Sequence, residues 1–442
     1  MARFLSKFTK AEKSWILYDW ANSVYATNIM AAIFPIYFSA VCGDNGVQMW
    51  GYGTSIATLV VAILVPFLGG VGDYKGMKKK LFTFFLVLGL VFTLTMAIFD
   101  QWQMLLVGYI FSYIGFAGAN LFYDSFLTDV TTNERMDKVS SWGYAMGYIG
   151  GSTIPFIISI AVLLIMKMDN PIAVKISVLI TVVWWAVFSL PILRNGKQEH
   201  YVETPPNRLV KNTLSNIGHT LSNIFKRRGV FLFILAYFFY IDGVGTVIHM
   251  STSYGSTLGL DTQGMIMALL VTQIVAVPCS IYFGKLSNKV GSIRMISIAI
   301  AIYFLICAVG FYMGFSIEQA EPFMHSQPDV YKAALARSQV LFWIMAFLVG
   351  TVQGGIQALS RSYFGKLIPP EKSNEYFGFF DIFGKFATVV GPLLVALFTD
   401  WTGRSSIGIL SILILFALGG ALLFAGRKHF KIAEQESQAE PE

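Results

Sequence analysis

Polar residues that could bind a proton or a small solute lie inside a long apolar stretch near the middle of the chain. Asp242, Gly245, Thr246 and His249 follow the spacing i, i+3, i+4, i+7, so a helix would place all four on one face. Asp242 lies about 12 residues into that stretch, roughly 18 Å at 1.5 Å per residue. A carboxylate at that depth can take up and release a proton, or it can make a buried hydrogen bond to His249 or another neighbour. Both interpretations remain open at this point.

A second charged pair lies further along the chain. Asp381 and Lys385 are separated by four residues, so an intrahelical ion pair can form between them. Such a pair can serve only to neutralise charge in the bilayer, or it can open toward a cavity where Lys385 binds a substrate carboxylate. The internal repeat described below aligns these two positions with Tyr144 and Tyr148. The charge is therefore confined to one half, which favours a functional role.

The first apolar stretch carries a polar face made of Asp19, Asn22, Ser23 and Tyr25, which is unsuited to contact with lipid. Asp19 follows Lys13 by only six residues. It can therefore act as a gate at the inner end of a membrane helix or as a ligand nearer mid-membrane.

Long apolar runs must position these residues. The hydrophobic fraction is 55%, charged residues make up 13% and the mean hydropathy is +0.62, values that exclude a water-soluble protein. The runs are long enough to cross a bilayer, and we expect an all-α membrane protein with twelve transmembrane helices. Their expected ranges are 14–41, 48–72, 80–99, 103–127, 139–166, 171–193, 230–256, 262–286, 293–315, 337–363, 374–399 and 405–426.

The distribution of cations predicts the orientation. If the N-terminus is cytoplasmic, 26 of the 32 Lys and Arg residues fall in inner segments and five in outer ones. Such a bias indicates that both termini are cytoplasmic and that the protein is a multi-pass protein of the plasma (inner) membrane. It also accounts for the net charge of +7 without nucleic-acid binding.

A polar linker divides the helices into two groups of six. We expect an N-terminal bundle over 1–193, a cytoplasmic linker over 194–229, a C-terminal bundle over 230–428 and a disordered cytoplasmic tail over 429–442. Three registers of similar residues relate the two halves, including Asp124-Ser125-Phe126 with Arg361-Ser362-Tyr363 at an offset of 237. Two such halves predict a pseudo-symmetric transporter with its substrate site between them.

The loop between the second and third predicted helices contains Gly69, Asp73, Gly76, Lys78 and Lys79 in the pattern GxxxDxxGxKK. The glycines permit a tight turn and close helix approach, and Asp73 can bind a helix N-terminus or the cations of the loop. This pattern resembles the cytoplasmic signature of the major facilitator superfamily. The resemblance implies that Asp73, Gly69, Gly76 and Lys79 form a gate that stabilises the outward-facing state.

A degenerate copy of the loop runs from Gly284 to Arg294, with Asn288 in place of the acid, so we expect it to form a weaker gate. The runs Leu17–Ser23 and Gln357–Ser362 are similar to the vacuole-effluxer-like branch of that superfamily, which includes a fungal autophagy-related exporter of vacuolar amino acids. The arginine motif common on the fourth helix of the superfamily is absent here, where Asp124 and Asp129 stand instead. Asp124 and Arg361 lie at inner helix ends, where gating or interhelical pairing is the favoured interpretation.

These features predict a secondary active transporter and no enzyme. We expect a small polar solute, with zwitterions such as amino acids or peptides among the candidates, and H⁺ as the coupling ion. The chain contains no nucleotide-binding motif and no metal-ligand spacing, so we expect no cofactor and no metal. The expected partners are the solute, the coupling ion and the lipid bilayer, and we expect a monomer. A sensor on the same scaffold, a lipid scramblase and a membrane-embedded enzyme remain the alternatives.

Overall fold

The computed structural model describes residues 7–151, 153–166, 170–203, 222, 224–387 and 389–438. The chain divides into two compact units. Unit 1 comprises Met1–Ile224, Ile368–Ile382 and Ser437–Glu442, and unit 2 comprises Phe225–Leu367 and Phe383–Glu436. Within the described ranges the regular secondary structure is helical, apart from one isolated parallel bridge between Tyr74 and Val202.

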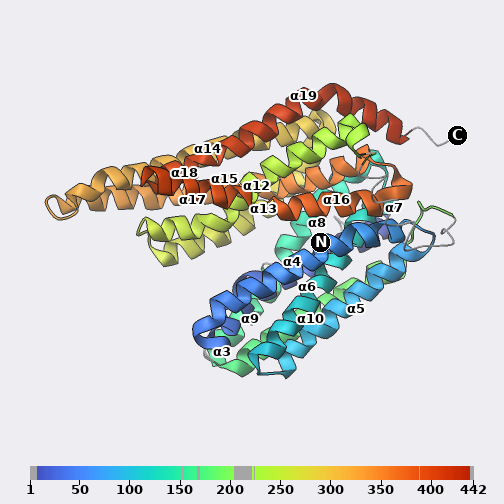
Figure 1. Ribbon diagram of the computed structural model, residues 1–442, viewed down its shortest axis with the longest axis horizontal. Coiled ribbons are helices and arrows are strands. Elements are labelled where there is room, and N and C mark those ends of the chain that lie inside the picture. Colours follow the sequence, from blue (N-terminus) through green and yellow to red (C-terminus); the bar gives the residue numbers. More distant parts are fainter. Residues whose placement is uncertain are drawn as a thin grey trace. The chain divides into compact units, whose positions relative to one another are not determined.

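Unit 1 is a helical bundle in which α5 packs along α6, while α2 packs against both α8 and α10. Figure 1 shows these helices in blue to green. Their bounds are α2 Lys10–Tyr25, η1 Ala26–Ala32, α3 Phe34–Cys42, η2 Gly43–Asn45, α4 Gly46–Gly72, α5 Met77–Ile98, α6 Trp102–Ser125, α7 Leu127–Val130, α8 Asn133–Gly150, α9 Ile154–Met166 and α10 Pro171–Asn195.

Unit 2 is a second bundle, in which α15 packs along both α13 and α14 and α17 packs against α18. These helices run from yellow-green to red in Figure 1. Their bounds are α12 Arg228–Thr257, α13 Thr262–Val290, α14 Ser292–Ala320, η3 Glu321–Phe323, α15 Pro328–Leu367, α17 Val390–Thr402, α18 Ser405–Ser411 and α19 Leu413–Gln438, with η4 Pro370–Lys372 and most of α16 Ser373–Phe386 belonging to unit 1.

The helices have the length and surface expected of membrane spans. Among the described residues, eleven helices are long and apolar enough to cross a bilayer, and Val390–Thr402 is a shorter apolar helix. Large apolar side chains remain on the outside, for example Ile63 and Phe424, both 68% exposed. Water would disfavour so many exposed apolar groups, whereas lipid does not. The predicted all-α membrane class is therefore confirmed.

The first predicted helix, 14–41, is not one regular α-helix. A π-helical segment, η1, separates α2 from α3, and Pro35 lies in the first turn of α3. Proline cannot donate a helical hydrogen bond and disfavours helical geometry in the residue before it, so the path changes here. Within η1, the buried Asn28 donates hydrogen bonds to Ser159 and Thr181, both at 3.0 Å, and so links η1 to α9 and α10.

The last two predicted helices, 374–399 and 405–426, also differ from the structure. The first is divided into α16 and α17 just before Gly391 and Pro392, for the same reason that proline interrupts helix hydrogen bonding. The second is divided between α18 and α19, and α19 continues to Gln438. The prediction of a disordered tail from residue 429 is therefore wrong as far as Gln438, because Phe430 and Ala433 are buried within unit 2.

The packing of residues 368–382 crosses the sequence boundary that we predicted. This segment lies within the C-terminal range 230–428 but packs as part of unit 1. Of the predicted linker 194–229, residues 204–221 and 223 lie outside the described part of the chain.

Candidate functional site

Asp73 in the α4–α5 loop binds the N-terminus of α16 within unit 1. Its Oδ1 accepts hydrogen bonds from the backbone N–H of Asn374 at 2.9 Å and from Asn374 Nδ2 at 2.8 Å. Its Oδ2 accepts one from the backbone N–H of Glu375 at 3.2 Å. The first N–H groups of a helix have no partner in the helix itself and favour negative charge. The sequence allowed Asp73 to bind either a helix N-terminus or the cations of the loop. The described hydrogen bonds are to a helix N-terminus.

Two glycines of the loop motif are required by this geometry. A Cβ on Gly69 would lie 2.5 Å from the carbonyl oxygen of Asn374 and 3.1 Å from the Cα of Glu375, so a larger residue would push α16 away. Gly76 has φ of 72° and caps α5, a backbone conformation that favours glycine. Gly69 thus allows close approach, and Gly76 allows the turn.

Lys78 forms the buried centre of the same network. Its side chain is fully buried, and Nζ lies 2.6 Å from Asp129 Oδ2, whose side chain is also buried. Nζ donates two further hydrogen bonds, to Ser373 Oγ at 2.9 Å and to the carbonyl oxygen of Ser125 at 3.3 Å. The hydroxyl of Ser125 donates to the side chain of Asn374. Residues 373–374 of α16 are therefore bound to both α5 and α6.

The prediction from the loop motif named Lys79 as a gating residue and gave Lys78 no role of its own. Lys79 is only half-buried and lines an open pocket, whereas Lys78 is the buried member of the lysine run. The sequence also left Asp129 without a role. Two signals for the Lys78–Asp129 pair were present in the sequence. One is the acid that lies one residue before the end of the span 102–130, and the other is the run of three lysines at 78–80.

The segment after α10, residues 196–203, covers the loop, and we call it the strap. Gln198 Nε2 donates to the carbonyl oxygen of Gly72 at 3.1 Å. The N–H of Val202 donates to the carbonyl oxygen of Asp73 at 2.9 Å. Asp129 Oδ1 accepts the N–H of His200 at 2.9 Å, so the strap and the buried lysine share one carboxylate. Beyond the length of the linker, no pattern in the sequence predicts these contacts.

Two titratable groups of this network lie outside the spans. Burial raises the pKa of Asp73 to about 8, and the nearby Glu375 acts in the same direction, while Lys78 and Asn374 oppose it. The hydrogen bond from His200 to Asp129 raises the pKa of the imidazole. In the folded protein both shifts favour the protonated forms. Alkaline pH therefore destabilises this hydrogen-bond network.

The polar face of α2 lies against α8 and α6 within unit 1. Asn22 is buried and donates to Asn120 Oδ1 at 2.7 Å. Asp19 is half-buried, and a Cβ added to Gly147 would lie 3.7 Å from the Cβ of Asp19. Since Gly147 lies on α8 between Tyr144 and Tyr148, both half-buried, these predicted candidates belong to neighbouring positions of the α2–α8 interface.

In unit 2, Asp242 on α12 is fully buried at the N-terminus of α17. Both of its oxygens lie 3.0 Å from the backbone nitrogen of Gly391, and Thr246 Oγ1 is 3.4 Å from Oδ1. A Cβ on Gly391 would collide with the Thr246 hydroxyl. Within the described residues no Lys or Arg lies within ion-pair distance of Asp242. The break before α17 thus supplies the N–H that binds this carboxylate.

His249 lies apart from Asp242. It is exposed on α12, and the described hydrogen bonds of Asp242 go to Thr246 and Gly391 instead. Of the two predicted residues on the shared face that have polar side chains, Thr246 contacts the carboxylate of Asp242 and His249 does not.

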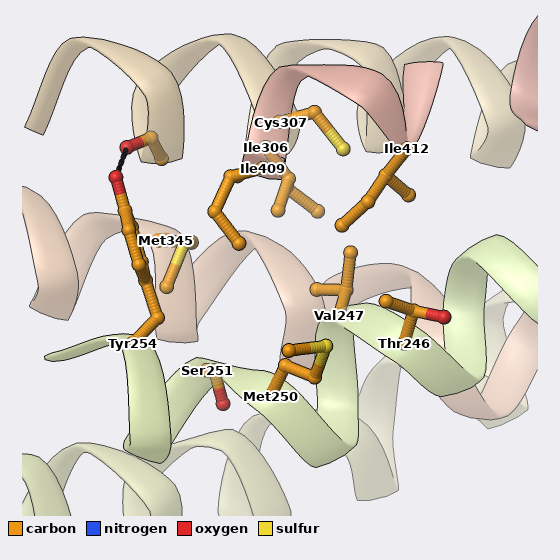
Figure 2. Close-up of a pocket in the computed structure, with 11 residues that line it drawn as sticks. Thr246, Val247, Met250, Ser251, Tyr254, Ile306, Cys307, Met345, Ile409 and Ile412 are labelled. Atoms are coloured by element: carbon orange, nitrogen blue, oxygen red, sulfur yellow. Dashed lines mark hydrogen bonds between the residues drawn. The ribbon is translucent and has the colours of Figure 1, made fainter. Parts of the chain in front are cut away.

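A small cavity in unit 2 adjoins Thr246. Its volume is about 20 Å³, which is room for one water molecule. Figure 2 shows Val247 and Met250 of α12 facing Ile409 and Ile412, with Tyr254 at one end. Tyr254 donates to the carbonyl oxygen of Gly310 at 3.0 Å. Because its volume is that of about one water molecule, this cavity is too small for a larger solute.

The remaining predicted residues are placed as follows. Asp381 is half-buried on α16, and the side chain of its predicted partner Lys385 lies outside the described part. Asp124 is half-buried on α6, Arg361 is buried on α15, and Asn288 is exposed near the end of α13. The second loop thus differs from the first, in which Asp73 is buried.

Comparisons with known proteins identify relatives over nearly the whole chain. The family model described as "Vacuole effluxer Atg22 like" matches residues 49–435. An uncharacterized MFS-type transporter, YxiO of Bacillus subtilis, is 44% identical over 432 residues, covering 95% of each chain. Autophagy-related protein 22 of Eremothecium gossypii is 22% identical and covers 88% of this chain and 85% of its own.

Solved structures show the same fold at low sequence identity. The major facilitator superfamily transporter FucP in the outward conformation has a TM-score of 0.67 at 12% identity, covering 94% of this chain and 98% of its own. A bacterial homologue of the iron transporter ferroportin has a TM-score of 0.67 at 13% identity, covering 95% of this chain and 99% of its own. The predicted major facilitator fold is confirmed, and family and fold are those of transporters, not enzymes.

Proposed function

Because the chain belongs to the vacuole effluxer Atg22-like family and has the major facilitator fold of secondary transporters, we propose that it moves a small zwitterionic solute coupled to protons. It works as a monomer, by alternating access, in the plasma membrane, with both termini and the α4–α5 loop on the cytoplasmic side. The cation bias of the loops supports this orientation.

The burial of the Asp242 carboxylate within a membrane span is the observation that supports proton coupling. An ionised carboxylate within a span costs at least about 2.5 kcal/mol, and the described hydrogen-bond partners of Asp242, which include the Gly391 N–H and the Thr246 hydroxyl, are all uncharged. Burial opposes the charge, whereas the N-terminus of α17 favours it. A group held between these opposing effects can be occupied in either protonation state. Proton exchange at Asp242 would therefore be linked to movement of α17 relative to α12.

The Asp73 network supports the alternating-access part of the proposal. It binds residues 373–375 of α16 to the α4–α5 loop of unit 1. The same helix continues beyond Ile382 into the part of the chain that belongs to unit 2. Breaking three hydrogen bonds and the Lys78–Ser373 contact would free this half of α16. Release of α16 at this point is the gating step.

The chemistry of the solute follows from charge of both signs on the candidate helices. Asp381 and Lys385 on α16 carry charges of both signs, which would suit a molecule that carries an amine and a carboxylate. The sequence resemblance to exporters of vacuolar amino acids supports the same class. Amino acids and small peptides are therefore the first solutes to test.

The test begins with a thermal-shift screen of purified protein against amino acids, dipeptides, nucleosides and sugars. A solute that stabilises the protein is then tested for accumulation in proteoliposomes with an imposed pH gradient. We expect Asp242→Asn to remove gradient-driven accumulation while the protein remains folded.

Asp400→Asn is the matched control, because Asp400 is an exposed carboxylate in the same unit. If Asp242→Asn keeps full gradient-driven accumulation, Asp242 is not the coupling group. If no solute in the screen binds or moves, the sensor and scramblase alternatives regain weight, and lipid flip assays would then decide between them.

A further inference from the structure

A wide basic pocket lies beside the α4–α5 loop and is separate from the Asp73 network. Its volume is about 970 Å³, at the upper end of the range of about 300–1,000 Å³ found for small-molecule sites. It lies entirely within unit 1, between the first turn of α5 and the strap. Lys75, Lys79, Lys80 and Lys197 line it, and Glu199 is the acidic residue of the lining.

Most of this positive charge is not neutralised by the described residues. Lys75 forms an exposed pair with Glu203 at 3.2 Å, whereas no ion pair within the described part of the chain involves Lys79, Lys80 or Lys197. Lys78, in the same run, is buried and paired with Asp129. The run therefore separates into one lysine used inside the protein and neighbours directed to the pocket. The first turn of α5 contains no acidic residue to compete with an anion.

The position of the pocket relative to the apolar span indicates where its occupant comes from. Lys79 and Lys80 lie in the first turn of α5, and the apolar sequence of that span starts at Leu81. Thr83, one turn further into the span, also lines the pocket. Lysines at such a boundary reach the level of lipid phosphates, while the deeper part adjoins the acyl chains. The occupant should therefore be amphipathic, with an anionic head.

We propose that this pocket binds the phosphate of an anionic phospholipid headgroup. Lys79 and Lys80 would hold the phosphate from α5, and Lys197 would hold it from the strap. Because the strap is hydrogen bonded to the α4–α5 loop through Gln198 and Val202, the bound lipid would fasten the strap to that loop. The site is independent of the transported solute, so its test does not depend on the proposed function.

The test compares the full-length protein in two kinds of nanodisc, one of phosphatidylcholine alone and one of phosphatidylcholine with about 30 mol% phosphatidylglycerol. We expect phosphatidylglycerol to raise the apparent melting temperature by about 3 °C or more and native mass spectrometry to show one retained anionic lipid. The triple variant Lys79→Gln, Lys80→Gln and Lys197→Gln should lose at least half of this shift and the retained lipid. It leaves the Lys75–Glu203 and Lys78–Asp129 pairs in place.

The control variant is Arg427→Gln, Lys428→Gln and Lys431→Gln, which removes the same charge from exposed positions on α19. It should retain the lipid-dependent shift. Equal losses in the two triple variants would overturn the proposal, because the effect would then be general attraction to an anionic surface. Soluble glycerol phosphate at millimolar concentration should not reproduce the shift; an equal shift would overturn the lipid as the source of the phosphate.

Discussion

Replacing Gly69 by alanine should loosen the contact between the α4–α5 loop and α16. The added Cβ would lie 2.5 Å from the carbonyl oxygen of Asn374 and 3.0 Å from its carbonyl carbon, so backbone must move. A shift of about 1 Å would stretch the 2.8 and 2.9 Å bonds from Asn374 to Asp73 beyond hydrogen-bonding distance.

The magnitude follows from known costs. The strain of overpacking costs about 1–3 kcal/mol. If the backbone moves to relieve this strain, the two hydrogen bonds from Asn374 are lost at about 0.5–1.5 kcal/mol each, which is a similar cost. Alanine in place of glycine within a helix returns about 0.5–1 kcal/mol. A net loss of about 0.5–2 kcal/mol corresponds to roughly 2- to 30-fold faster amide exchange in residues 373–382 if exchange follows local opening.

Hydrogen–deuterium exchange with mass spectrometry measures this directly. Gly51→Ala is the matched control, because Gly51 lies on the same helix, α4, with no atom within 4 Å of an added Cβ. Exchange of residues 373–382 should rise in Gly69→Ala and stay at the wild-type rate in Gly51→Ala. If both variants exchange at the wild-type rate, Gly69 does not hold α16 in place.

Three further outcomes are expected. Raising the pH from 6 to 9 should lower the thermal stability of the wild type. The raised pKa of Asp73 means that the folded state binds more protons than the unfolded state between about pH 4 and 8. The free energy of unfolding should therefore fall by at most about 1.36 kcal/mol per pH unit in this range, and this dependence should flatten in Asp73→Asn. Gly391→Ala should abolish transport, because the Cβ would meet the Thr246 hydroxyl, while Gly420→Ala, with its nearest atom at 3.8 Å, should transport normally; equal activities would contradict the packing of α17. Arg135→Lys should lower the free energy of unfolding by about 1–2 kcal/mol because both Glu12 oxygens lie within 2.8 Å of the guanidinium, and an unchanged melting temperature would show that this pair is dispensable.

The sequence was sufficient for the class of protein and most spans, because apolar length and cation bias follow directly from the energetics of the bilayer. It was not sufficient for the interruptions. The pair Gly391-Pro392 was a readable signal of a break, yet the apolar run around it continues and the prediction kept one helix. Pro35 was overlooked in the same way near η1.

The candidate site was predictable only where a local motif carries it. The loop pattern identified Asp73, but its partner Asn374 lies 301 residues away, and no local pattern relates the two. Lys78 and Lys79 are adjacent in the sequence, so only the direction of the helix face separates the buried lysine from the pocket lysine. His249 shares the helical spacing of Asp242, but packing against α17 draws in Thr246 and leaves His249 exposed.

The most direct test of proton coupling at Asp242 separates exchange from net transport in the same proteoliposomes. With a solute identified by the thermal-shift screen, Asp242→Asn should retain counterflow, in which labelled and unlabelled solute exchange with no net proton movement. It should lose accumulation driven by a pH gradient, while Asp400→Asn keeps both activities. Gradient-driven accumulation by Asp242→Asn at the wild-type level would contradict the assignment of the proton to this carboxylate.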